Sequence, residues 1–262
     1  VGRLAFATDG TVYAAIGPGT ATGSGKVNAI VSLDPKTLQV KDWFTQAGVE
    51  FVTGPTIFKH DDRDVVAAAT KDGRVILLNA TSLGGSDHAT ALHASSALAT
   101  GIAANALATW QEMTIAPPPA AAAAPPAGPA GGPAQPNITY GARWILAATT
   151  TGVTALKLTD SGGSPSLQRG WTAQGLTGPE TPIVVNGVVF ALSSGRSATA
   201  AGRGTAAVLR AYDGTSGKEL WTSGKAMTAP ASPGSFWSAL SQIYVGTNDG
   251  SLHAFGFLDE RR

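Results

Sequence analysis

The chain has 262 residues, with 33 glycines, 16 prolines, no cysteine and a formal net charge of +1. Charged residues make up 13% of it, about half the usual share for a soluble protein. Few charges together with many glycines and prolines suit a fold of many short strands joined by turns. The absence of cysteine excludes disulfides and thiolate chemistry, the near-zero charge argues against a nucleic-acid partner, and no apolar run reaches the roughly 18 residues of a membrane span.

A strand–turn–strand pattern recurs along the chain. In its clearest copy, Ile243–Val245 are β-branched or aromatic, Asn248–Gly250 tolerate a positive φ, and Leu252 resumes the alternation. Five copies of this hairpin begin 54, 79, 43 and 55 residues apart, at Val12, Val66, Ile145, Val188 and Ile243. The shortest spacing matches one β-propeller blade, and longer spacings indicate insertions.

Each copy also has a predicted strand before the hairpin, at 4–7, 55–58, 106–113, 182–185 and 236–239. A short strand with a tryptophan follows the hairpin in three copies, at Trp43, Trp171 and Trp221. The second copy instead runs into Ser86–Ser96, and residues 258–262 are too short and charged for a good fourth strand of the last copy.

We therefore predict an all-β chain, a single partial β-propeller (1–262) of four-stranded antiparallel blades. About five blades are present, and the last is incomplete. Their approximate ranges are 1–48, 49–100, 101–175, 176–225 and 226–262. Five blades with one incomplete leave exposed edges, so we expect an open ring.

Two insertions interrupt the repeats. Residues 116–136 consist of proline, alanine and glycine apart from Gln135, and we predict a disordered insertion that the blade tolerates. The alternative is a proline-rich docking segment. Residues 197–205, which are rich in glycine and alanine, form a similar insertion in the fourth copy.

These copies resemble the repeat of the PQQ-binding-like (quinoprotein-type) β-propeller family, whose unit is similar to VYVGTxDGxLYALDxxTGKxxW. Ile243–Phe255 matches the first half of that unit, and Leu209–Trp221 matches the second. Other segments look like parts of the large extracytoplasmic propellers of Acidobacteria: Lys41–Phe44, Gly54–Phe58, Thr81–His88 and Ala108–Glu112.

That resemblance implies a periplasmic or secreted protein, of which this chain is the C-terminal part. It also implies a ring of seven or eight blades, with the missing blades supplied by sequence upstream of Val1 or by another chain. The export signal would then lie outside these residues. The likeness concerns the fold much more than the chemistry.

Active quinoprotein dehydrogenases of this family use a catalytic Asp, a Ca²⁺ ion held by Glu and Asn, a stacking Trp and usually a disulfide over PQQ. The disulfide is impossible here, and no residue of this chain lies in a matching motif. We expect the fourth-strand tryptophans to pack between blades. For Trp110, Trp144 and Trp237 we prefer core packing to a place in the central channel.

Histidines and carboxylates give weak signals. The segment His60–Asp64 has carboxylates close enough for a cation, but we prefer a solvated hairpin turn. His88 and His93 lack a zinc-site spacing, and alternation makes His253 a packing residue. We therefore assign no catalytic, cofactor-binding or metal-ligating residue.

Two functions remain open. The first is a non-catalytic propeller that binds a protein or polymer partner at its loop face. The alternative is a PQQ-dependent alcohol or sugar dehydrogenase that requires PQQ and Ca²⁺ and has part of its site upstream. A third, weaker idea is a subunit of a larger assembly whose partner covers the open edges.

Overall fold

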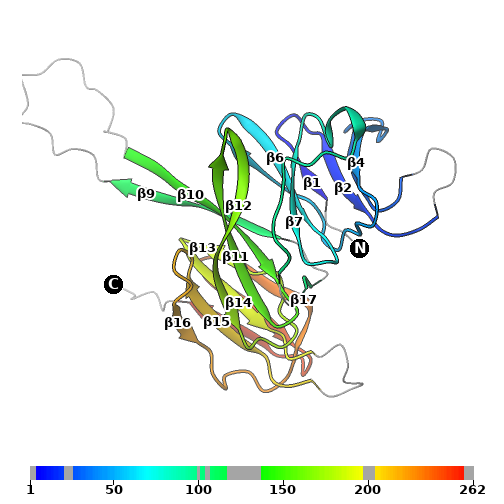
Figure 1. The fold of residues 1–262 in the computed structure, drawn as a ribbon. Helices are drawn as coiled ribbons and strands as arrows, with labels where there is room; N and C mark the ends of the chain where they lie inside the picture. The colour runs from blue at the N-terminus through cyan, green and yellow to red at the C-terminus, as the bar shows by residue number, and fades with distance from the viewer. Residues whose placement is uncertain are drawn as a thin grey trace, which may run out of the picture.

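The computed structural model describes residues 4–20, 26–98, 101–103, 107–116, 137–196 and 204–256. They form five antiparallel sheets that follow one another along the chain (Figure 1). We call the sheets blades one to five. The fold is an all-β propeller of about five blades, as the repeats predict.

The strands of each blade are adjacent in the sheet in chain order. Blade one contains β1 (Ala5–Phe6), β2 (Val12–Ile16), β3 (Ala29–Leu33) and β4 (Val40–Thr45). Blade two contains β5 (Thr56–His60), β6 (Arg63–Ala69), β7 (Val75–Asn79) and β8 (His93–Ala94). Blade three contains β9 (Ala108–Ala116), β10 (Asn137–Ala148), β11 (Gly152–Ser161) and β12 (Ser164–Gln174).

Blade four contains β13 (Ile183–Val185), β14 (Val188–Ser193), β15 (Val208–Asp213) and β16 (Glu219–Thr222). Blade five contains β17 (Ala231–Ala239), β18 (Gln242–Thr247) and β19 (Leu252–Gly256), so its described part has three strands. One 3-10 turn, η1 (Gly85–Asp87), precedes β8. Among the described residues no helix is long and apolar enough to cross a bilayer.

In blades two to four the central strands are apolar on both faces because each of these blades lies between two others. In β6, Val65 and Ala67 belong to the cluster shared with blade three, whereas Val66 and Ala68 face blade one. Successive side chains of a strand point to opposite faces, so this run supplies two cores at once. The small alanines allow neighbouring sheets to approach closely.

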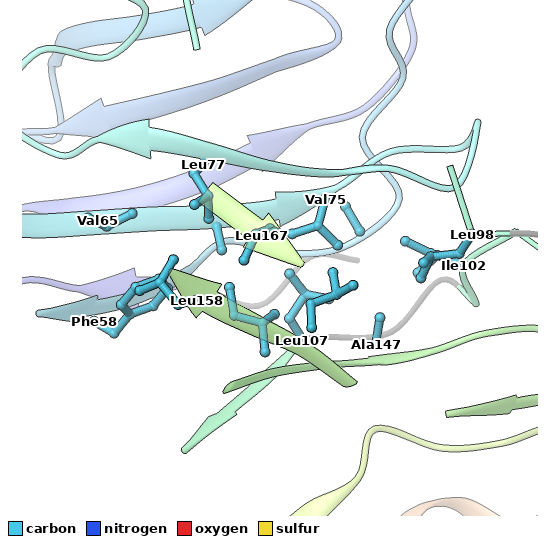
Figure 2. Close-up of a cluster of buried hydrophobic side chains, with 14 residues drawn as sticks. Phe58, Val65, Val75, Leu77, Leu98, Ile102, Leu107, Ala147, Leu158 and Leu167 are labelled. Carbon is cyan, nitrogen blue, oxygen red and sulfur yellow. The ribbon is translucent and has the colours of Figure 1, made fainter. Parts of the chain in front are cut away.

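Four hydrophobic clusters join consecutive blades. Figure 2 shows the one between blades two and three, where Phe58, Val65 and Leu77 meet Leu158 and Leu167. Of the clusters that the described residues form, none joins blade five to blade one.

The recurring turn glycines serve two physical purposes. Gly73 and Gly250 have φ of +87° and +83°, which side-chain-bearing residues rarely adopt. Gly152 lies at the start of β11, where a Cβ atom would be 2.0 Å from the Ala173 carbonyl oxygen. The first two glycines are needed for their turns, and the third for a close approach between strands.

Each fourth-strand tryptophan contacts the next blade, as predicted, although Trp221 remains 43% exposed. Trp43 stacks on His88 of blade two, with ring centroids 3.7 Å apart. Trp171 donates a hydrogen bond from Nε1 to the Gly214 carbonyl of blade four at 2.8 Å. Trp221 makes an edge contact with Phe255 of blade five at 5.6 Å.

Three sequence predictions lie wholly or largely outside the described residues. They are the Pro/Ala/Gly insertion from 117 onward, the segment 197–203 of the fourth copy, and the charged residues 258–262.

Candidate functional site: the blade-three arm and its cleft

Blade three has an extension, which we call the arm: residues 111–116 of β9 paired with 137–143 of β10. Pairing of β10 with β11 begins only at Trp144, whereas β11 stays paired with β12 as far as Ser161, so the arm separates from the β11–β12 hairpin. Figure 1 shows it projecting away from the other strands. A two-stranded ribbon buries little surface, so an arm of this kind is suited to contact something else.

One face of the arm is apolar and exposed. Met113 lies opposite Tyr140, and Ile115 lies opposite Ile138. Their exposed fractions are 53%, 64%, 57% and 46%, respectively. Cross-strand partners share a face of a sheet, so these four side chains form one surface, which we call the arm face. Exposed apolar patches of this kind are typical of interaction sites.

The opposite face of the arm is polar and is tied to the propeller. Thr114 and Thr139 are paired there and exposed. Glu112 accepts hydrogen bonds from the Ala142 amide at 3.2 Å and from Trp144 Nε1 at 2.8 Å. These bonds hold the bulge between Tyr140 and Arg143, which keeps Arg143 on the same face as Tyr140.

A cleft of about 340 Å³ lies where the arm face meets the β5–β6 turn of blade two. Its lining includes Lys59, His60 and Asp61 from that turn, and Gln111, Tyr140 and Arg143 from the arm. The guanidinium of Arg143 lies 5.2 Å from the Phe58 ring and donates to Gln111 Oε1 at 2.7 Å. Burial lowers the pKa of Arg143, and its buried Nε has no hydrogen-bond partner.

At the edge of the cleft, His60 meets a residue that lies far away in sequence. Its Nε2 is 2.9 Å from Oδ1 of Asp160 on β11 and 4.0 Å from Oδ2 of Asp61. Within the described part of the chain these three form the one group of His and carboxylate side chains whose ligand atoms all lie within 4.8 Å of one another.

The sequence indicated the segment His60–Asp64 as a cation candidate, but it did not predict the group of His60, Asp61 and Asp160. Asp64 pairs with Lys59 at 3.6 Å instead, and Asp62 is exposed outside the group. Asp160 was missed because its contact with His60 spans 100 residues. No local spacing could have signalled that contact.

The remaining tryptophan candidates differ from one another. Trp144 is buried and Trp110 packs beside it in the core between blades three and four. Trp237 stacks on Tyr244 at 5.5 Å but remains 41% exposed, so core packing is wrong for this residue.

Two of the other histidines, His88 and His253, have structural contacts. His88 Nδ1 lies 2.9 Å from Asp42 Oδ1 in addition to the stack on Trp43. His253 lies beside Phe255, with ring centroids 6.3 Å apart. His93 has a buried Nε2 without a hydrogen-bond partner.

One of three similar solved structures, BBS1N, has a TM-score above 0.5 and supports the fold. BBS1N, solved in complex with ARL6DN, matches over 94% of this chain and 60% of that chain, with 11% identity and a TM-score of 0.52. This chain thus spans less than two thirds of that protein's length. The match to BamB from Moraxella catarrhalis covers 97% of this chain and 73% of the BamB chain, with 14% identity and a TM-score of 0.43.

The quinohemoprotein alcohol dehydrogenase from Comamonas testosteroni matches 84% of this chain and 38% of its own, with 14% identity and a TM-score of 0.41. No family model matches the sequence, and no curated protein matches it. At 11% identity the likeness to BBS1N concerns the fold alone, the other two TM-scores are below 0.5, and none of the three assigns an activity.

Proposed function

We propose that the chain is a non-catalytic binding module and that the arm face holds an apolar segment of a protein partner. The observation that carries this proposal is the exposed surface of Met113, Ile115, Ile138 and Tyr140 on a ribbon that projects from its blade. No charged residue occurs from Met113 to Ala142, so a partner can cover the face without desolvating a charge. The outer edge of β9 is also an edge of its sheet, where an extended partner segment could add a strand.

The test compares two faces of the same arm. One variant carries Ile115→Asp and Tyr140→Asp, and the matched control carries Thr114→Asp and Thr139→Asp on the opposite face. Proteins cross-linked in an extract of the source cells are identified by mass spectrometry, and direct binding of each purified candidate is then measured. We expect the control to bind like the wild type and the face variant to lose at least about tenfold in affinity. Equal loss, or equal binding, in the two variants would contradict the proposal.

The dehydrogenase hypothesis has its own readout. Because part of that site would lie upstream, the full-length protein is reconstituted with PQQ and Ca²⁺ and assayed for a quinone absorbance band and for dye-linked oxidation of alcohols and sugars. If both signals were observed, the dehydrogenase would be the better supported function and the binding-module proposal would be abandoned.

We also propose an extracytoplasmic location and a ring completed by further blades, from this chain's own protein or from another. The repeat resemblance supports the location. The exposed apolar faces of blades one and five, described below, support the additional blades.

A further inference from the structure

The group at the edge of the cleft combines an imidazole with two carboxylates from two different blades. His60 lies on blade two and Asp160 on blade three, and their ligand atoms are 2.9 Å apart. With Asp61, all three ligand atoms lie within 4.8 Å of one another. The His60 side chain is only 16% exposed, whereas those of Asp61 and Asp160 are 69% and 53% exposed.

This donor set has the chemistry of a divalent transition-metal site. Imidazole nitrogen and carboxylate oxygen bind Zn²⁺ at about 2.0–2.2 Å, so neighbouring ligand atoms of a tetrahedral ion are separated by roughly 3.3 Å. The separations of 2.9 Å, which is a hydrogen bond in the structure, and 4.0 Å lie on either side of that value, and the third pair of ligand atoms lies within 4.8 Å. Small rotations of the two exposed carboxylates would therefore bring all three atoms onto one ion.

The surroundings support a ligand at this position. The nearest lysine on the turn, Lys59, is paired with Asp64, which leaves Asp61 and Asp160 to face His60. The cleft opens beside His60 and Asp61. Three protein ligands leave one tetrahedral position, and the cleft gives room for a water or an anionic group there.

We propose that His60, Asp61 and Asp160 bind one Zn²⁺ ion, which joins the blade-two turn to β11 at the mouth of the cleft. This site does not depend on the arm face. The binding module proposed above could fail while the metal site holds, and the reverse is equally true.

The experiment uses the full chain without a histidine tag, dialysed against a chelator and then titrated with ZnCl₂ in a calorimeter. We expect one Zn²⁺ per chain and a rise in melting temperature with added Zn²⁺. His60→Gln and Asp160→Asn should each weaken Zn²⁺ binding by more than about tenfold. The control Asp62→Asn removes an exposed carboxylate of the same turn outside the group, and its affinity should equal that of the wild type.

Melting curves in chelator establish that all three variants are folded before they are titrated. Loss of binding in His60→Gln and Asp160→Asn with retention in Asp62→Asn supports the site. The proposal is overturned if the wild type shows no saturable Zn²⁺ binding, or if folded His60→Gln and Asp160→Asn bind as tightly as the wild type.

Discussion

At the scale of single residues, Tyr13 on β2 makes a buried polar contact between blades one and two. Its side chain is 3% exposed, and its hydroxyl donates to the Ala80 carbonyl of blade two at 2.9 Å. Burial, with smaller contributions from the carboxylates of Asp9, Asp64 and Asp42, raises the pKa of Tyr13 from 10.0 to about 12. Ionisation would remove the donor and leave a buried phenolate.

This residue predicts a loss of stability at alkaline pH. A tyrosine whose folded pKa exceeds its unfolded pKa binds more protons when folded, so its contribution is complete below pH 10 and is lost as pH rises toward 12. The free energy of unfolding, measured in urea between pH 9 and pH 12, should therefore fall less steeply in Tyr13→Phe than in the wild type. Parallel curves for the two proteins would be evidence against a raised pKa.

Residue-level reasoning from the sequence found part of the candidate site. The carboxylate-rich turn at His60 was visible as a cation candidate, and the roles of Trp43, Trp171 and Trp221 followed from the repeat. Asp160 was invisible because strand lengths in blade three decide whether it reaches His60. Trp237 departs from core packing because it lies on the face of blade five that points away from blade four.

At the scale of elements, the strand order and the turns could be predicted because each copy repeats the same alternation. The arm could not. The prediction began β10 at its apolar run near Ile145, but the strand begins at Asn137. The bulge between Tyr140 and Arg143 shifts the alternation by one residue, so the outer half of the strand does not continue the pattern of the inner half.

The β15–β16 turn shows how tightly neighbouring blades fit. Gly217 has φ +71°, and a Cβ atom there would lie 2.6 Å from ring atoms of Trp171 in blade three. Gly175 has a similar φ, +77°, but nothing lies within 4 Å of such an atom. Comparing substitutions at Gly175 and Gly217 therefore distinguishes the cost of backbone strain alone from the added cost of steric overlap between blades.

We expect Gly175→Ala to lower the free energy of unfolding by about 1 kcal/mol, which is the strain of the left-handed backbone. Gly217→Ala should cost at least about 1 kcal/mol more, because the Trp171 ring must also move. Chemical denaturation of both variants measures the difference. If the two variants lose the same stability, Trp171 does not pack on this turn in solution.

At the scale of the whole molecule, the two end blades each pack one face on a neighbouring blade, and their other face has no neighbouring blade among the described residues. In blade one, Ala5 belongs to the core shared with blade two, whereas the flanking Leu4 and Phe6 are 54% and 62% exposed. In blade five, Ile243 and Val245 face blade four, whereas Trp237 stacks on Tyr244 on the other side. Both outer faces are therefore apolar and lack a neighbouring blade among the described residues.

Such faces predict that the 262-residue chain self-associates, with blade one of one copy against blade five of another. Each of these faces is apolar and would gain a neighbouring blade in that contact. Sedimentation velocity should show a concentration-dependent increase in mass for the wild type. Phe6→Glu and Trp237→Glu should each reduce it, since a charge on either face must be desolvated in the contact. Leu240→Glu is the matched control, because Leu240 is 91% exposed at the β17–β18 turn and belongs to neither face. A wild type that stays monomeric at every concentration would show that the two end faces do not bind each other. It would also weaken the proposal that further blades complete the ring.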